Sequence, residues 1–227
     1  MTGVQLLMTE QNYDGAIAVF TESMRKLKQE LIVATSRESN IDCEDEHQES
    51  EQRPSAIVDF CELGESDDDI PFNRAITITY REGEHFVGER DMELFSAAVI
   101  YNIALVYHHQ VVNGSHKRNR TSSHSIQQKA EKLYDTVITL LVRNSLESPS
   151  LVRAAVLIQL ACCNNLAQLR FRSGLDDSAR RCLEMASGLL LMAKDDIDDT
   201  ILEDNLVQGL ILRAFLLRSL PQMAAAA

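Results

Sequence analysis

The sequence predicts an all-α protein, and three observations lead to that prediction. First, several long segments repeat apolar residues at spacings of three and four, which is the period of an amphipathic helix. Second, the 227 residues include only 9 Gly, 4 Pro and no Trp, and aromatic residues make up 5% of the chain. A sheet protein of this size needs more turn, β-branched and aromatic residues. Third, three of the helical segments share one pattern of small and large residues, which predicts stacked helical hairpins.

The helical segments are bounded by residues that commonly begin or end helices. Ser125 is expected to cap one helix, Ser148 and Pro149 suit the first turn of the next, and Gly174 suits its end. Asp176 places a negative charge at the N-terminus of the following helix, where the helix dipole favours it. The predicted helices span residues 14–34, 91–112, 125–144, 148–174, 176–194 and 199–219.

Three segments interrupt this helical pattern. Residues 36–69 are polar and acidic and show no apolar period, so we expect a flexible acidic loop, in which "AIVDFCELG" is a candidate strand or turn. Residues 74–83 alternate β-branched residues with a period of two, which predicts a short extended segment. Residues 113–124, rich in Ser, Asn and basic residues, are interpreted as an insertion in a turn.

Three helices carry the same residue spacing on one face. A small residue is followed four positions later by a large one, three later by a smaller one, and four later by Leu. The small residue allows a neighbouring helix to approach closely, and the large one fills the space beside it. The three sets are Ala16, Phe20, Ser23 and Leu27; Ala130, Tyr134, Val137 and Leu141; and Ala179, Leu183, Ala186 and Leu190.

The helices that precede the last two of these also match each other. One carries Asn102-Ile103-Ala104 and the other carries Asn165-Leu166-Ala167, 63 residues later. The helix at 199–219 has Asn205-Leu206 in the same phase. These observations predict a single domain over residues 1–227, with about three helical hairpins and a C-terminal capping helix. A plain helical bundle is the alternative fold.

With these motifs the sequence resembles the tetratricopeptide repeat (TPR) family. The matching elements are the aliphatic-Ala pair, Tyr107 three residues after the first of these pairs, the turn Gly174, and the small–large–small face of the second helix. The chain is also similar to short, divergent TPR-like proteins of diatoms and related algae. The resemblance covers roughly residues 13–28 and 93–193. It implies a superhelix in which the first helix of each hairpin lines a concave groove.

In the TPR family an Asn on that first helix often hydrogen-bonds the backbone of a bound peptide. The resemblance therefore implies a groove for a protein or peptide segment. The other interpretation is that each Asn bonds a neighbouring helix or loop, as buried amides do. The groove residues expected by this resemblance are Tyr101, Asn102, Leu105, His108, His109, Asn165, Gln168, Phe171, Arg172 and Asn205.

The charge of the chain is concentrated in one segment. Residues 42–69 contain 12 acidic residues and one basic residue, whereas the other 199 residues have 22 acidic and 21 basic residues. The segment is interpreted as a solvated loop, or as an arm that covers the groove or contacts the basic residues 117–120. Ser66, which precedes three acidic residues, is a candidate phosphorylation site. Nucleic-acid binding needs a broad basic surface, which this sequence does not offer.

No other motif predicts chemistry. His108, His109, His116 and His124 lie close in sequence, but adjacent helical residues diverge and no Cys-x-x-Cys accompanies them, so no metal is expected. No Gly-rich phosphate loop or local nucleophile–base pair is present, so no cofactor and no enzymatic activity are expected. The odd number of cysteines, with no export signal or membrane span, indicates a cytoplasmic protein, or a nuclear one.

The predicted function is therefore that of an adaptor that binds a protein segment in a helical groove. Two alternatives remain open. One is an enzyme or small-ligand module with a pocket between the helices and residues 55–90. The other is a structural subunit whose groove is permanently buried in a larger assembly.

Overall fold

The computed structural model describes residues 12–38, 57–62, 74–79, 89–114, 120–142 and 149–192, and within them the protein is predominantly helical, as an all-α class predicts. The helices are α2 (Tyr13–Glu38), α3 (Glu89–Gly114), α4 (Arg120–Val142), α5 (Pro149–Arg172) and α6 (Asp176–Met192). Two short strands, β1 (Ile57–Glu62) and β2 (Arg74–Thr79), lie between α2 and α3 in the sequence. The predicted helix at 199–219 lies outside the described residues.

The helix ends have local causes that can be read from the sequence. Asn12 caps α2, since its Oδ1 accepts a hydrogen bond from the Gly15 N–H at 2.9 Å. After α5, Gly174 adopts a φ of 71°, and the N–H groups of Gly174 and Leu175 bond back to the carbonyls of Phe171 and Arg170. This is a Schellman motif, in which a residue without a side chain ends the helix. The tight turn predicted between α5 and α6 is therefore confirmed.

One predicted boundary is wrong. The sequence predicts Ser125 as the N-cap of the helix at 125–144, but α4 already begins at Arg120. The insertion predicted at residues 113–124 is correspondingly shorter, because Gly114 still belongs to α3 and residues 120–124 are helical. Residues 120–124 include no apolar residue, so hydropathy alone did not mark the start of the helix.

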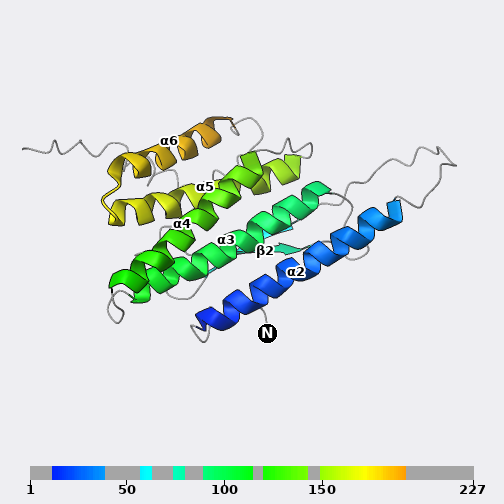
Figure 1. Ribbon diagram of the computed structural model, residues 1–227. Helices are drawn as coiled ribbons and strands as arrows, with labels where there is room; N and C mark the ends of the chain where they lie inside the picture. The colour runs from blue at the N-terminus through cyan, green and yellow to red at the C-terminus, as the bar shows by residue number, and fades with distance from the viewer. Residues whose placement is uncertain are drawn as a thin grey trace, which may run out of the picture.

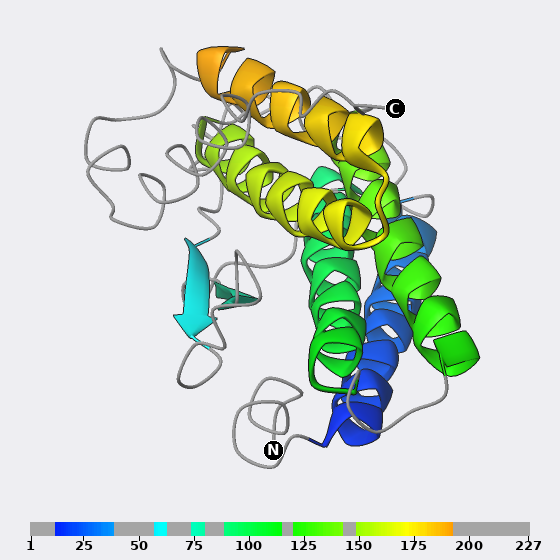
Figure 2. The ribbon, with the colours of Figure 1, turned by 90° about the vertical axis from the view of Figure 1, so that its left-hand side faces the viewer.

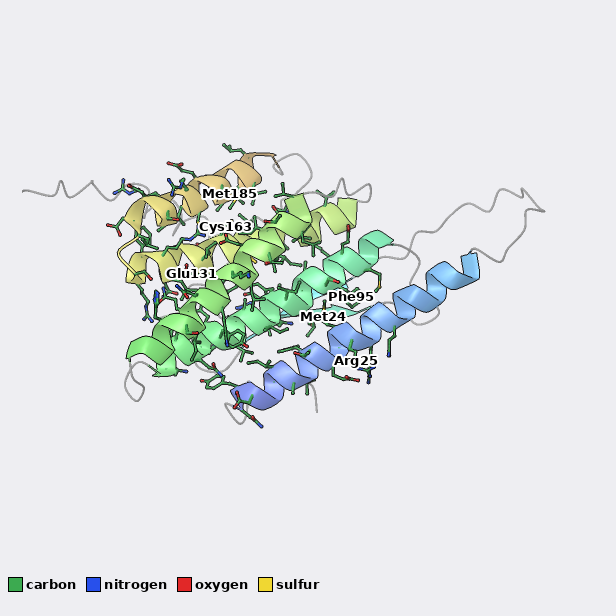
Figure 3. All side chains as sticks on the ribbon, in the orientation of Figure 1. Met24, Arg25, Phe95, Glu131, Cys163 and Met185 are labelled. Carbon is green, nitrogen blue, oxygen red and sulfur yellow. The ribbon has the colours of Figure 1, made fainter. Side chains whose placement is uncertain are left out.

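The helices pack in a regular order. α3 packs against α4 and α5 against α6, while α4 also packs against α5, α2 against α3, and α3 against α5. Figure 1 shows the helices stacked in the order of the sequence. Figure 2 shows the strands β1 and β2 on the side of α3 opposite to α2 and α4. Figure 3 shows Met24 and Phe95 between α2 and α3, and Cys163 between α5 and α6.

The repeated small–large–small face is the buried face of each helix. Its large residues Phe20, Tyr134 and Leu183 are buried beside the small residues that precede them by four positions, Ala16, Ala130 and Ala179, which are fully buried. The pattern thus predicted the core correctly, because an alanine at a helix crossing permits the close approach that a larger side chain would prevent. Ser23, the third member in α2, is exposed.

The two strands form an antiparallel hairpin in which Phe60 faces Ile76. The extended segment predicted from the alternation "RAITIT" is confirmed as β2. Within the predicted loop at 36–69, the candidate strand in "AIVDFCELG" is confirmed as β1 at residues 57–62, whereas residues 36–38 belong to α2. Among the described elements other than β1, β2 packs substantially only against α3.

One described segment, Val152–Arg172 within α5, is long and apolar enough to cross a membrane by length and composition, and 78% of its most apolar window is buried inside the protein. A core helix of a folded domain has the same properties. In the structure this helix packs against α3, α4 and α6.

Candidate functional site

The side chain of Asn102 holds the main chain of β2. Its Nδ2 donates a hydrogen bond to the Ile76 carbonyl at 2.8 Å, and its Oδ1 accepts one from the Ile76 N–H, also at 2.8 Å. A carboxamide can make this pair because it carries a donor and an acceptor side by side. Both groups are buried, so the pair satisfies main-chain atoms that would otherwise be costly to remove from water.

Tyr101 extends the same contact along the strand. Its hydroxyl donates to the carbonyl of Arg74 at 3.1 Å, two residues before Ile76. Alternate residues of a strand direct their polar groups to the same edge, so both contacts lie on the edge of β2 that does not face β1. The helix α3 therefore takes the place of a third strand along this edge.

The strand is also covered on both of its faces where it meets α3. Ala75 and Ile76 point to opposite faces, since they are consecutive in a strand, and their exposures are 0% and 3%. The site on α3 thus combines main-chain recognition by Tyr101 and Asn102 with apolar packing around two small or aliphatic side chains of the strand.

Asn165, at the equivalent place in α5, has a different partner. Its Nδ2 donates to the hydroxyl of Tyr134 on α4 at 3.2 Å, and that hydroxyl lies 3.4 Å from Nδ1 of His108 on α3. The Tyr134 ring is inclined to the Tyr101 ring at 5.9 Å between centroids. The result is a buried polar network that connects three helices through one tyrosine.

The buried His108 is held in its neutral form. Its pKa is lowered from 6.5 to about 3, mainly by burial and to a smaller extent by the charges of His109 and Arg172, while Gln168 acts in the opposite direction. Neither Nε2 of His108 nor Oε1 of Gln168 has a hydrogen-bond partner in the structure, although the two side chains interact. Oδ1 of Asn164 and Oε1 of Gln159 also lack one, so α5 carries buried acceptors that could take further hydrogen bonds.

Two tyrosines and two cysteines of this region are also held neutral. Burial raises the pKa of Tyr101 and of Tyr134 well above its usual value. Burial likewise raises the pKa of the Cys162 and Cys163 thiols. A buried thiol that stays protonated is a poor nucleophile, so these cysteines pack as small apolar residues in this structure.

Arg170 joins α5 to both of its neighbouring helices. Its Nη2 contacts both carboxylate oxygens of Asp135 on α4, the nearer at 2.8 Å, and its Nη1 donates to Sγ of Cys182 on α6 at 2.9 Å. The residue in the equivalent repeat position of α3 is Tyr107, whose ring lies 5.6 Å from Nζ of Lys129. Both positions thus fasten the first helix of a hairpin to the second, by different chemistry.

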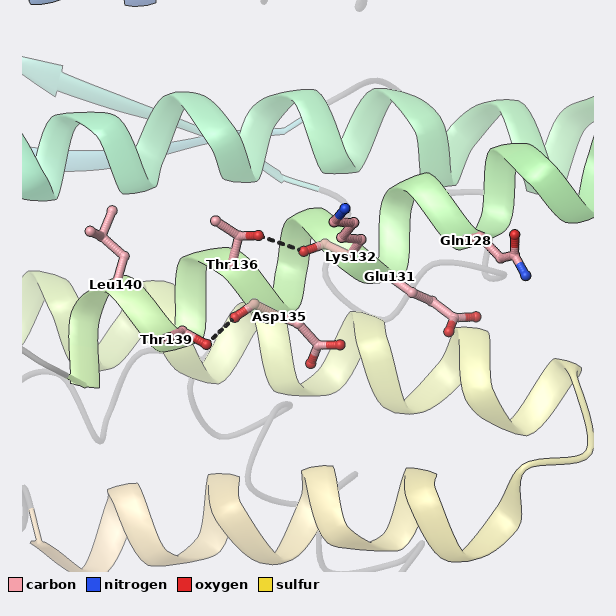
Figure 4. A pocket seen from close by; sticks show the side chains of 7 residues that line it. All are labelled: Gln128, Glu131, Lys132, Asp135, Thr136, Thr139 and Leu140. Carbon is pink, nitrogen blue, oxygen red and sulfur yellow. Dashed lines mark hydrogen bonds between the residues drawn. The ribbon is translucent and has the colours of Figure 1, made fainter.

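A hollow of about 530 Å³ lies on the outer face of α4, and its lining includes Asp135, the ion-pair partner of Arg170. Figure 4 shows its lining, in which the hydroxyls of Thr136 and Thr139 bond to carbonyls of their own helix. Those hydroxyls are therefore already engaged, and the lining holds no Cys, His or Ser. The hollow is lined by Gln128, Glu131, Lys132, Asp135, Thr136, Thr139 and Leu140.

Most of the predicted groove residues that the structure describes are enclosed by β2 and the adjacent helices. Gln168 and Phe171 are partly buried, Arg172 is exposed, and Asn205 and Ser66 lie outside the described residues. The buried members are Tyr101, Asn102, Leu105, His108, His109 and Asn165.

Sequence reasoning missed the partners of these residues. The period of β2 was visible in "RAITIT", and Asn102 was singled out, but no sequence signal connected the two. Tyr134 was identified as a core residue and not as the centre of a polar network. Within the described residues no group of three or more His, Cys, Asp or Glu side chains could hold a metal ion.

The fold and this geometry define a predominantly helical protein of stacked helical hairpins with an extended strand held against α3. Comparison of the chain with protein families, with curated proteins and with solved structures finds no significant match. Any function must therefore be argued from the residues themselves.

Proposed function

We propose that this protein is a TPR-like interaction module, a helical-repeat adaptor that binds an extended segment of another protein along the face formed by α3 and α5. The single observation that carries the proposal is the pair of hydrogen bonds from Asn102 to the main chain of Ile76. The α3 face holds an extended polypeptide by its backbone, which is how peptide-binding surfaces gain affinity.

The arrangement of the helices supports this proposal. The α3/α4 hairpin packs on the α5/α6 hairpin through α5, which contacts both α3 and α4. In a stacked repeat this order aligns the first helices side by side and gives one continuous face. Asn102 and Asn165 occupy equivalent positions on these two helices, and the buried acceptors of Asn164 and Gln168 lie on α5.

The exposed end of the face provides a test. A photo-crosslinking amino acid placed at Arg172, which is exposed at the end of α5, samples this face. The same amino acid placed at Thr136, in the hollow on α4, samples the outer face. Each variant is expressed in the source cell, irradiated and purified, and the crosslinked peptides are sequenced by mass spectrometry.

We expect a recurring partner segment crosslinked from position 172 and absent from position 136. Crosslinks from position 136 alone would place the binding surface on the outer face and contradict the proposal. Absence of recurring crosslinks from both positions would contradict an adaptor function through either face. Circular dichroism of each variant ensures that the fold is retained before the crosslinks are compared.

A further inference from the structure

We propose that the Tyr101–Asn102 turn of α3 is a main-chain-reading site that β2 occupies in cis, and that the partner is an extended segment that replaces β2 there. This inference rests on the proposed function, and it names both the class of partner segment and the way in which the chain regulates access. The geometry already contains an occupied peptide site, in which the occupant belongs to the same chain.

The hydrogen bonds from Tyr101 and Asn102 to β2 are made to its backbone. Asn102 binds the N–H and C=O of Ile76, and Tyr101 binds the C=O of Arg74. Neither contact depends on the identity of the strand's side chains. Any extended segment that presents one residue's N–H and C=O to Asn102, with a carbonyl two residues earlier, can make the same three hydrogen bonds.

The hairpin is attached to the helical stack in a way that allows replacement. Among the described elements its substantial packing is with α3 alone, and β1 packs substantially only on β2. A two-stranded hairpin is only marginally stable by itself, so its order depends on the contact with α3. β2 competes well with a separate segment for the site on α3, because the short connection between β2 and α3 keeps the effective concentration of β2 in the millimolar range.

The packing around β2 defines the side chains that a replacing segment needs. Ala75 is fully buried and Ile76 is 3% exposed, on opposite faces of the strand. The site therefore fits a small residue followed by an aliphatic, β-branched one. A large residue at either place would clash, and a charged residue would lose its hydration without gaining a partner. The partner class is an extended segment with this pair of residues.

The test uses the full-length protein and a fluorescent peptide of its own residues 71–80, "PFNRAITITY". The opened variant is Ile76→Pro, which removes the N–H that donates a hydrogen bond to Oδ1 of Asn102. Because that N–H faces α3, the hydrogen bonds between β1 and β2 stay in place. The matched control is Ile76→Val, which keeps both the N–H and the aliphatic side chain. Binding of the peptide is measured by fluorescence anisotropy.

The opened variant is expected to bind the peptide about 10- to 1000-fold more tightly than the wild type or Ile76→Val, since a site that is mostly occupied loses affinity in proportion to its free fraction. Adding Asn102→Leu to the opened variant should abolish the gain. A peptide N-methylated at the residue that corresponds to Ile76 should bind weakly, because it lacks the N–H that Asn102 reads.

A second form of the protein retains every native side chain at the site. A protease site inserted within residues 80–88 is cut after folding, which releases β2 from its direct connection to α3. The cut protein should bind the peptide more tightly than the uncut one. This form decides the question if Ile76→Pro does not fold.

Equal affinities of the wild type, the cut protein and a folded Ile76→Pro variant would overturn the inference, as would equal binding of the N-methylated peptide. If a partner crosslinks at position 172 while these affinities are equal, the proposed adaptor function stands and only the cis occupancy fails. If the peptide binds the opened site but position 172 gives no partner, the inference stands and the adaptor function through the α3–α5 face fails.

Discussion

Asn102 and Asn165 occupy the same position in successive hairpins, yet they bind different kinds of partner. Asn102 on α3 holds the main chain of Ile76 with both atoms of its amide. Asn165 on α5 donates to the hydroxyl of Tyr134, a side chain of the helix between them. Asn102 thus attaches the strand β2 to the helical stack, whereas Asn165 connects two helices of the stack, α5 and α4.

The difference shows that a repeated residue fixes a location on the helix but not a role. Both positions lie beside an aliphatic-Ala pair on the first helix of a hairpin, so each amide is carried into a buried region. A buried amide needs partners, and it takes those that the surrounding elements supply. At α3 the hydrogen-bond partner is the main chain of an extended strand, whereas at α5 it is a tyrosine hydroxyl.

The largest expected effect concerns Tyr134, which is fully buried and touches both regions. Tyr134→Ala should lower the free energy of unfolding by about 3–5 kcal/mol, because it leaves a cavity beside Tyr101 and His108. Tyr134→Phe should lower it by about 1–2 kcal/mol by removing only the hydroxyl that Asn165 binds. Urea unfolding followed by circular dichroism measures both. Equal losses for the two variants would mean that packing around the ring is unimportant.

The network around Asn165 contains a titratable group, whereas no ionisable side chain makes the Asn102–Ile76 hydrogen bonds. The pKa of His108 is about 3 in the folded protein and 6.5 in the unfolded chain. The unfolded chain therefore binds the extra proton, so the stabilising effect of neutral His108 is present above pH 6.5 and is lost as the pH falls toward 3. By pH 4 the loss should be about 3 kcal/mol.

The control for this prediction is His108→Gln, which removes the titration. Unfolding free energies of both proteins are measured by urea titration from pH 7 to pH 4, and their difference is compared, because carboxyl groups elsewhere affect both proteins alike. The wild type should lose more stability than the variant over this range. Parallel curves would show that His108 accepts a proton inside the folded protein.

The two asparagines can be compared directly by Asn102→Ala and Asn165→Ala. Loss of Asn102 leaves the buried N–H and C=O of Ile76 without partners, which should destabilise the docked hairpin by about 2 kcal/mol or more. That value corresponds to roughly 30-fold faster hydrogen exchange at the Ile76 amide, which mass spectrometry or NMR can follow. Asn165→Ala should leave this exchange rate unchanged. Faster exchange in both variants would show that the hairpin and the network form one cooperative unit.

The smallest expected effect concerns Arg170. Its side chain is 18% exposed and that of Asp135 is 52% exposed, so their ion pair is only partly shielded from water. Arg170→Met, which keeps most of the apolar length, should lower the free energy of unfolding by about 0.5–1 kcal/mol at low salt and by less at high salt. Arg153→Met, a change at an exposed arginine of the same helix, is the control. A loss that does not depend on salt would assign the role of Arg170 to packing.

Much of the fold could be predicted because its causes are local. The alternation in "RAITIT" predicts a strand, Gly174 predicts a helix end, and Ala130 and Tyr134 predict a buried face at a helix crossing. Each of these depends on residues within a few positions of one another. The start of α4 at Arg120 was not predicted, because residues 120–124 include no apolar residue to mark the first turn.

The candidate site was located by sequence but not understood from it. Asn102 stood out because its position repeats at Asn165, and both were expected to face an open groove. The structure instead places both in buried surroundings, since β2 covers α3 and Tyr134 lies beside α5. The sequence does not indicate which of many distant polar groups will form hydrogen bonds with each other. Those pairings are set by the tertiary packing.

By itself, the sequence determined the helical class of this protein, the strand at β2, the small residues at the helix crossings and the two asparagines in phase, because periodicity, propensity and caps act over short distances along the chain. Only the tertiary structure decided that Asn102 holds Ile76, that Asn165 meets Tyr134, and that His108 stays neutral. These outcomes depend on which elements pack together, since a buried donor or acceptor pairs with whatever packing brings within about 3 Å.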